Sequence, residues 1–330
     1  MNDGPLVPFD AGRPSVARIH DYALGGKDNF AADRELTAEL REIFAHGAVL
    51  ARESREFQAR AVGYAARQGV GQFIDVGSGM PASPAVHEVA GPDARVAYVD
   101  NDPVVISHTA ALLARPGSIA AVPGDVRCPQ DILASPGLAA VIDTSRPFCL
   151  ILAMILNFIE PAQAAGIMAE FRDAMPAGSF LVLSIGVNDD APDVAQDFIK
   201  AYSAAPVYQH SREEIMGYFA GLEIVEPGLT EARNWRPAHA PADAAPRPAD
   251  ALACVGRKAR LRERAARTWL PLMAAVGLCQ ADGTRMCSSW SAAFLSGVWM
   301  VNCPLASGAY ALRRSQVLPS TVMALRPRET

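Results

Sequence analysis

The chain has 330 residues, half of them hydrophobic, which is enough to bury a large core in one or two domains and excludes a disordered protein. Its formal net charge of −5 comes without a long basic run, so no nucleic-acid partner is expected and small-molecule chemistry is favoured. The six cysteines form no C-x-x-C pair, so we expect neither a metal site nor a disulfide scaffold. No basic start followed by an apolar stretch marks a signal peptide, and we expect a cytoplasmic protein.

Two amphipathic helices are predicted before the first strand. Apolar residues recur at helical spacing from Ala31 to Ala45 and again from Leu50 to Ala65. Ahead of them, residues 21–30 read DYALGGKDNF, and the glycine pair lets the backbone fold tightly or approach a ligand closely. We predict a loop here. A phosphate-binding loop is excluded, because Asp28 follows the lysine where a hydroxyl residue is required.

Five short apolar runs follow, separated by helix-like segments: QFIDV, RVAYVD, SIAAV, FCLILAMIL and SFLVLSIGV. Such continuous apolar runs are typical of a parallel sheet that is buried on both faces. Ser211 and Glu214 then match a helix capping box, with Gly221 as the expected stop. Two later runs, LEIVE and ALACVG, are predicted to pair as an antiparallel hairpin, and the Pro- and Ala-rich residues 237–250 between them as a mobile surface excursion.

The strongest motif is FIDVGSGMP, in which a strand ends at Asp75 and Gly77 and Gly79 form a tight turn before a helix. The next two predicted strands end in YVDND and PGDVR, which carry Asp100 and Asp125. The carboxyl ends of parallel strands lie at one edge of the sheet, where such sheets bind nucleotide-like ligands. Each residue alone is explained by ordinary turn chemistry, but three aligned signals favour a nucleotide-like site. A dinucleotide such as NAD remains an alternative ligand.

Longer segments extend this pattern: PSVARIHDYALGGKDNF, AVGYAARQGVGQFIDVGSGMP, VHEVAGPDARVAYVDNDPVV, GDVR, GLEIVEPG, NWRP and ALACVGRK. In these segments the chain resembles the actinobacterial family of S-adenosylmethionine-dependent methyltransferases formerly described as a domain of unknown function. The resemblance implies an α/β class I methyltransferase fold, which is Rossmann-like. Its seven-stranded, mostly parallel sheet has helices on both faces, the last strand antiparallel, and an N-terminal helical segment in front.

The resemblance covers roughly residues 13–258, and together with the change of composition after Lys258 it predicts three regions. Residues 1–70 form a loop and helices that cover the cofactor site, and residues 71–258 form the S-adenosylmethionine-binding core. Residues 259–330 form an extension of unknown role, which we interpret as a poorly ordered or loosely packed appendage. Its uncharged stretch from Met286 to Leu312 has the length of a membrane span, but its serines, Asn302 and Pro304 argue against one.

The implied activity is transfer of a methyl group from S-adenosyl-L-methionine, the donor, to an unidentified small molecule. The acid before the first glycine, Asp75, is more typical of such methyltransferases than of dehydrogenases. The resemblance places Asp75 near the donor's amino group, Asp100 on the ribose hydroxyls and Asp125 at the adenine amine. The residues implied to bind the donor are Tyr22, Gly25, Gly26, Lys27, Asn29, Asp75, Gly77, Gly79, Asp100, Asn101, Asp102, Asp125, Val126, Ala153 and Met154.

We interpret the glycine-rich segment 21–30 as a lid over this pocket, with an N-terminal cap that merely packs on the sheet as the alternative. Aromatic side chains that are candidates to line an acceptor pocket, or else ordinary core residues, are Tyr22, Phe158, Tyr202 and Tyr208.

Four positions depart from the family pattern: His20 replaces Tyr, Ser54 and Ala85 each replace Asn, and Asn157 replaces His. His20 and Asn157 are the candidates for a catalytic role, although a structural histidine is the simpler interpretation of His20. The missing histidine at position 157 weakens the case for a general base. A non-catalytic donor-binding or regulatory protein is therefore the second hypothesis, and an NAD-dependent oxidoreductase is the third.

Overall fold

The computed structural model describes residues 10–187, 192–238, 250–259, 291–295, 298–302 and 309–312. The chain divides into two compact units, Met1–Glu263 and Arg264–Thr330. In the second unit, three described strands form an antiparallel sheet in the order β11-β10-β9: β9 (Ser291–Leu295), β10 (Val298–Asn302) and β11 (Ala309–Leu312). The remaining residues of the predicted appendage, and residues 239–249 of the predicted surface excursion, lie outside the described part of the chain.

The first unit is built on an eight-stranded mixed sheet with the order β3-β2-β1-β4-β5-β8-β6, and β7 also pairs with β8. Five strands are parallel: β1 (Gln72–Val76), β2 (Arg95–Asp100), β3 (Ile119–Pro123), β4 (Cys149–Ala153) and β5 (Phe180–Val187). Three more strands join at one side through antiparallel pairs: β8 (Asp250–Arg257) pairs with β5, and β6 (Glu223–Ile224) and β7 (Thr230–Glu231) each pair with β8, so β8 alone runs against the other strands. The predicted α/β fold with its antiparallel terminal pair is confirmed.

The predicted count of seven strands is wrong. LEIVE, the segment expected to form the strand beside β8, supplies only β6, and the additional strand β7 follows it; β6 pairs with Gly256 and Arg257, and β7 pairs with Leu252 and Ala253. Pro227 and Gly228 separate them: proline has no N–H to donate to the ladder, and Gly228 turns with a φ of +91°. After this turn the chain pairs with β8 a second time, which adds the eighth strand.

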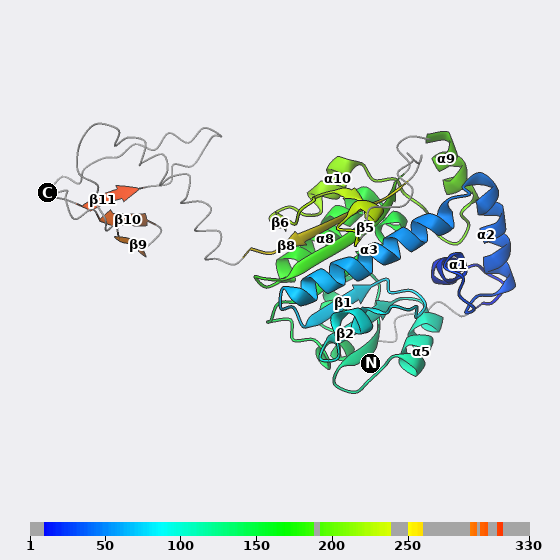
Figure 1. Cartoon of the computed structure of the whole chain (residues 1–330), viewed down its shortest axis with the longest axis horizontal. Coiled ribbons are helices and arrows are strands. Elements are labelled where there is room, and N and C mark those ends of the chain that lie inside the picture. Colours follow the sequence, from blue (N-terminus) through cyan, green and yellow to red (C-terminus); the bar gives the residue numbers. More distant parts are fainter. Residues whose placement is uncertain are drawn as a thin grey trace. The chain divides into compact units, whose positions relative to one another are not determined.

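Helices cover both faces of this sheet. Alternate strand residues form two apolar clusters, so Ile74, Leu150 and Leu181 face one side and Phe73 and Ile151 the other. The helices after the first strand are α4 (Val86–Ala90), α5 (Pro103–Leu112), α6 (Pro129–Leu133), α7 (Pro136–Ala139), η1 (Leu156–Phe158), α8 (Pro161–Ala174), α9 (Pro192–Ala201), α10 (Arg212–Gly217) and η2 (Ala232–Asn234). In Figure 1, α3 (Gly47–Arg67) crosses one face and α8 lies on the other. The capping box of α10 is confirmed, although the helix ends at Gly217, before Gly221.

Three helices, not two, precede the first strand: α1 (Val16–Ala23), α2 (Ala31–Ile43) and α3. The prediction that residues 21–30 are entirely loop is wrong, because Asp21 to Ala23 complete α1. Ile19 gives α1 a buried apolar contact with Leu36 and Leu40 of α2, which outweighs the polar character of the segment. Figure 1 shows α1, α2 and α9 gathered at one side of the sheet.

A pair of glycines offers a test of this packing. A methyl group on Gly256 of β8 would lie 2.7 Å from the Phe219 ring and 3.0 Å from Leu222, so Gly256→Ala should lower the free energy of unfolding by about 1–2 kcal/mol. Gly166 in α8 has open space around it, so Gly166→Ala should raise that free energy by about 0.5–1 kcal/mol. Urea unfolding of the two variants measures both. Equal effects would show that β8 does not pack as described.

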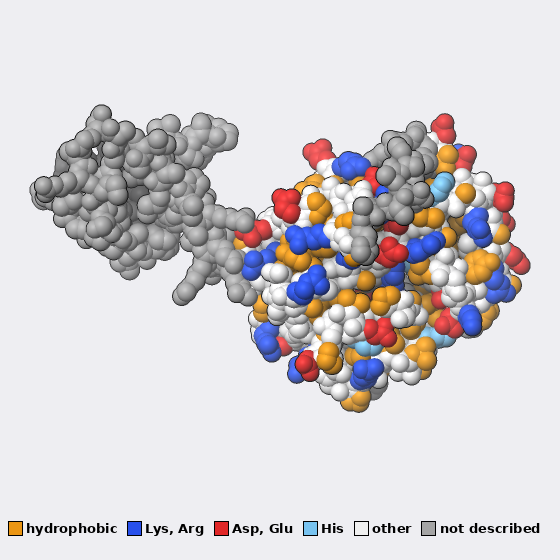
Figure 2. Space-filling model, in the orientation of Figure 1, with side chains coloured by type: hydrophobic (Ala, Val, Ile, Leu, Met, Phe, Trp, Pro, Cys, Tyr) orange, Lys and Arg blue, Asp and Glu red, His pale blue; other side chains and the backbone are white. Residues whose placement is uncertain are grey.

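The surface of the first unit mixes charges of both signs. On the face shown in Figure 2, acidic and basic side chains are interspersed over the described residues. None of the helices among the described residues is both long enough and apolar enough to cross a membrane.

Candidate functional site

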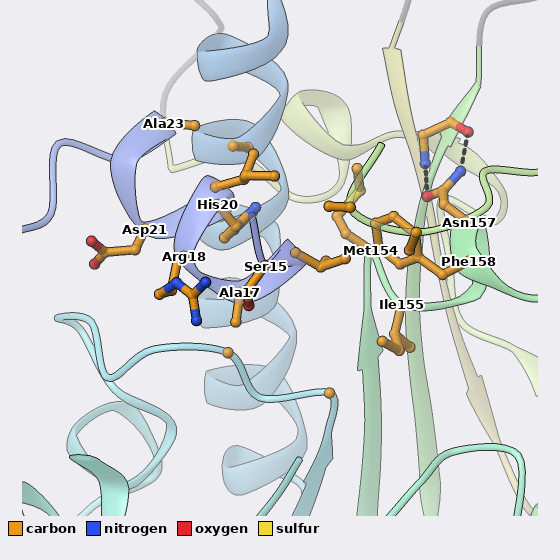
Figure 3. Close-up of a pocket in the computed structure, with 18 of the residues that line it drawn as sticks. Ser15, Ala17, Arg18, His20, Asp21, Ala23, Met154, Ile155, Asn157 and Phe158 are labelled. Carbon is orange, nitrogen blue, oxygen red and sulfur yellow. Dashed lines mark hydrogen bonds between the residues drawn. The ribbon is translucent and has the colours of Figure 1, made fainter. Parts of the chain in front are cut away.

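A cavity of about 780 Å³ lies at the carboxyl ends of β1, β2, β3 and β4. Its volume falls within the range of small-molecule sites, roughly 300–1,000 Å³. In Figure 3, His20 on α1 faces Met154 and Phe158, which follow β4, across this space. The residues predicted to bind the donor that line the cavity are Tyr22, Asp75, Gly77, Gly79, Asp100, Asn101, Asp102, Asp125, Val126, Ala153 and Met154.

The turn after β1 brings backbone against the cavity. Gly77 and Gly79 have φ values of +71° and +66°, which side chains other than glycine rarely adopt. A methyl group on Gly77 would also lie 2.7 Å from Ile155, whereas Gly79 faces open space. Gly77 is therefore required both for the backbone conformation of the turn and for close packing against Ile155. Gly79 leaves room for a ligand to approach the backbone.

Asp100, at the end of β2, ties this turn to the next loop. One carboxylate oxygen accepts the Gly79 N–H at 2.9 Å and the other accepts the Asp102 N–H at 2.9 Å. Burial nevertheless raises the pKa of Asp100 to about 6. The carboxylate is thus held in a fixed orientation at the edge of the cavity.

Asp75, at the end of β1, belongs to a chain of polar contacts that reaches α3. Gln58 donates to the Asp75 carboxylate at 3.1 Å, and Arg55 donates to the Gln58 carbonyl oxygen at 2.9 Å. Burial raises the pKa of Asp75 to about 6, although the nearby Arg55 cation works in the opposite direction. All three side chains line the cavity.

Two polar atoms at this end of the cavity have no hydrogen-bond partner. They are the Arg55 Nε and the Ser78 Oγ, both buried. A buried donor without a partner costs roughly 1–3 kcal/mol, so such atoms in a cavity indicate where a ligand's acceptor groups would bind. Sequence analysis missed Arg55 as a site residue. Its spacing of three from Gln58, on one face of a predicted helix, is the signal that would have indicated it.

The residues after β2 and β3 already engage one another. Asp102 caps α5 by accepting the Val104 N–H at 2.8 Å, and its other oxygen accepts the Ser15 hydroxyl at 2.7 Å. Asp125 accepts hydrogen bonds from the Arg127 guanidinium and, at 3.3 Å, from Asn101. Although partial burial raises the pKa of Asp125, the bonds from Arg127 hold it below its ordinary value. Arg127 was not among the predicted site residues.

The glycine-rich segment folds around its own first residue. The Asp21 carboxylate accepts the Asp28 N–H and the Asn29 amide, each at 2.9 Å. A methyl group on Gly26 would lie 1.9 Å from that carboxylate. In Figure 3, Asp21 points to the opposite side of α1 from His20. Four residues of the predicted donor site do not line the cavity: Gly25, Gly26, Lys27 and Asn29.

Neither catalytic candidate is placed as a general base. Desolvation and the Arg55 cation lower the pKa of His20 to about 4, so its imidazole is neutral at pH 7 but a weak base. The amide of Asn157 is bound to the Gly186 backbone, as N–H donor and as acceptor at 2.8 Å each (Figure 3). Asn157 therefore ties the turn after β4 to β5.

Met154 stands at the turn where β4 ends. Its φ is +59°, which is uncommon for a residue other than glycine and typical of positions held by functional constraints. Among the aromatic candidates, Tyr22, Phe158 and Tyr202 line the cavity, whereas Tyr208 does not. The cavity thus has a polar end at β1 to β3 and continues past Met154 to aromatic side chains.

Comparison with known proteins gives consistent results. A family model described as S-adenosyl methyltransferase matches residues 5–259. A DUF574 family protein from Streptomyces avermitilis has 35% sequence identity and a TM-score of 0.71, over 76% of this chain and 99% of that one. A protein from Thermobifida fusca, proposed to be a methyltransferase, has 36% identity and a TM-score of 0.71, over 76% of this chain and 97% of that one. No curated protein matches the chain significantly.

Proposed function

The chain belongs to the S-adenosyl methyltransferase family, and on this basis we propose that its cavity binds S-adenosyl-L-methionine and presents the methyl group to a small-molecule acceptor. The family membership favours methyl transfer over the NAD-dependent alternative. It also makes the chain an S-adenosyl-L-methionine-dependent methyltransferase, so the proposals concern which side chains bind the donor and the acceptor.

The observation that carries the proposal is the match between the polar end of the cavity and the amino acid part of the donor. That part carries an ammonium and a carboxylate group. The unpartnered Arg55 Nε and Ser78 Oγ fit the carboxylate, and Asp75 fits the ammonium. Opposite charges are thus available for both ends of the zwitterion.

The adenosine part fits the loops after β2 and β3. Asp100 is oriented by two backbone N–H groups, and a carboxylate at this place in a doubly wound sheet binds ribose hydroxyls. Val126 is buried and apolar beside Asn101 and Asp125, as an adenine ring requires. The donor then points its sulfur past Ala153 and Met154.

Methyl transfer from a sulfonium is an in-line displacement, for which the donor supplies an electrophilic methyl group. The protein has to hold two reactants in line and keep water out. Helix α1 keeps water out in our proposal. The Ser15 hydroxyl donates a hydrogen bond to Asp102, and Arg18 forms an ion pair with Asp33 at 2.8 Å, so that α1 is fixed over the cavity. Tyr22 contacts the donor from α1, while Gly25, Gly26, Lys27 and Asn29 shape the turn that follows this helix.

Calorimetry with S-adenosyl-L-methionine tests the function directly. We expect saturable binding by the intact protein, and release of S-adenosylhomocysteine when an acceptor from a metabolite extract is supplied. Absence of binding to the folded protein would contradict the proposed site. Binding without turnover on any natural acceptor would favour the non-catalytic hypothesis.

Donor affinity should depend on pH. Burial raises the pKa of Asp75 and of Asp100 to about 6, from an ordinary value of 3.8. Below about pH 6 both carboxyls take up a proton, which removes the charge that attracts a cationic ligand. For one obligatory carboxylate, affinity should fall about tenfold between pH 7 and pH 5. Titration calorimetry at several pH values measures this dependence.

The stability of the protein without ligand should follow the opposite trend. A raised pKa means that the folded state binds these protons more tightly than the unfolded chain does. The stabilisation that these two carboxyls contribute is therefore complete below about pH 4 and is lost as the pH rises through about 6.

A donor affinity that does not change between pH 5 and pH 7 would exclude both carboxylates from the binding site.

A further inference from the structure

The cavity continues beyond the donor end along a surface that we call the acceptor wall. It is formed by the lining residues of α2, Phe44 after it, η1, the end of β5, α9 and residues 202–209. Four aromatic rings contact one another in succession along it: Phe44 and Phe198 have centroids 6.0 Å apart, Phe198 and Tyr202 5.5 Å, and Tyr202 and Phe158 5.8 Å. A wall of this kind binds a flat, apolar molecule.

Three polar side chains that line this side of the cavity, those of Thr37, Ser54 and Asn157, are already engaged. Thr37 donates to the Asp33 carbonyl oxygen at 2.7 Å, Ser54 and Ser184 bond each other at 2.7 Å, and Asn157 holds Gly186. With the pKa of His20 lowered to about 4, no group on this side is suited to take a proton from an acceptor near pH 7 among the residues that the structure describes.

The charge of the acceptor wall is positive. Among its described residues the only charged side chain is Arg41, which is exposed on α2 and has no ion-pair partner there. The donor's sulfonium adds a second positive charge to the same space. An acceptor with its own positive charge would be repelled, and an anion would be attracted.

On the basis of the proposed function, we propose that the acceptor is a flat, apolar acid that is methylated on its carboxylate. A carboxylate is already ionised at pH 7 and needs no general base. Its lone pair forms the new carbon–oxygen bond while the carbon–sulfur bond breaks and leaves its electron pair on sulfur. The products are a methyl ester and a neutral thioether, with no proton to remove. An alkylamine or an alcohol would require a proton acceptor that this wall does not offer.

Binding of three matched probes tests the proposal independently of turnover. The intact protein, saturated with S-adenosylhomocysteine, is titrated with 2-naphthoate, 2-naphthamide and 2-naphthylmethylamine, which differ mainly in charge. We expect 2-naphthoate to bind at least about tenfold more tightly than the amine, and methyl 2-naphthoate to form when S-adenosyl-L-methionine replaces the product. Equal or tighter binding of the amine, or no binding of the acid, would overturn the proposal. Failure of S-adenosylhomocysteine itself to bind would instead contradict the proposed donor site.

Two further variants separate the acceptor wall from charges elsewhere. Arg41→Gln should weaken 2-naphthoate binding about twofold to fivefold, as for an exposed ion pair, and leave 2-naphthamide unchanged. Arg52→Gln removes an exposed cation that does not line the cavity and should change neither. Asp189 and Asp190 lie outside the described residues. Because the proposal assigns the order of affinities to the acceptor wall, a variant with both changed to Asn should keep that order. Loss of that order in the last variant would also overturn the proposal.

Discussion

Asp100→Asn is expected to weaken binding of S-adenosyl-L-methionine about 100-fold. Hydrogen bonds to a charged group contribute roughly 1.5–3 kcal/mol each, and the carboxylate is proposed to accept from two ribose hydroxyls. The two Asp100 oxygens accept the backbone N–H groups of Gly79 and Asp102. In the variant an NH₂ group replaces one of these oxygens, so a donor faces a backbone N–H. Calorimetry with the donor and with S-adenosylhomocysteine measures the loss.

The effect on the ligand has to be separated from an effect on the turn. Wild-type protein should prefer S-adenosylhomocysteine to its 2′-deoxy analogue, and Asp100→Asn should remove most of that preference, which a purely structural role would leave in place. Asp93→Asn, in an exposed turn before β2, is the matched control and should bind as wild type. An unchanged preference for the ribose hydroxyl in Asp100→Asn would exclude direct contact.

Arg55→Gln should give the second large effect, a loss of donor affinity of about 30-fold. The substitution removes the positive charge and the unpartnered Nε that we assign to the donor's carboxylate. Binding of 5′-methylthioadenosine, which lacks the amino acid part, should change less than about twofold. The comparison of these two ligands, each titrated into wild type and variant, isolates the carboxylate contact.

Arg52→Gln on the same helix serves as the control, because Arg52 is exposed and does not line the cavity. Equal weakening of both ligands in Arg55→Gln would indicate that Arg55 acts by orienting Gln58 and Asp75 instead of touching the donor. A wild-type affinity for S-adenosyl-L-methionine in this variant would remove Arg55 from the site altogether.

The backbone framework of the site was predictable from local patterns. Continuous apolar runs gave the parallel strands, and the acids and glycines at their ends gave the edge of the sheet where Asp75, Gly79 and Asp100 lie together. The extra strand was not predictable in this way, because β6 and β7 have two residues each and their pairing depends on how Pro227 and Gly228 turn against β8.

The partners of individual polar side chains were decided by the tertiary structure. The segment DYALGGKDNF had the composition of a ligand-binding loop. Its first residue, Asp21, nevertheless accepts hydrogen bonds from within the segment, and four of its residues do not line the cavity. Asn157, a candidate for catalysis, holds the Gly186 backbone instead. Hydrogen-bond partners depend on distances between atoms that are far apart in the chain, which residue types and spacing do not contain.

By itself, therefore, the sequence determined the class of fold, the edge of the sheet at which the cavity lies and the family to which the chain is similar, since these follow from periodicity and from motifs a few residues long. Only the tertiary structure decided which groups remain available to ligands. It left the Arg55 Nε and the Ser78 Oγ unpartnered, lowered the pKa of His20 through desolvation and brought the rings from Phe44 to Phe158 into contact. Burial and proximity set these properties, and both arise only when helices and strands pack together.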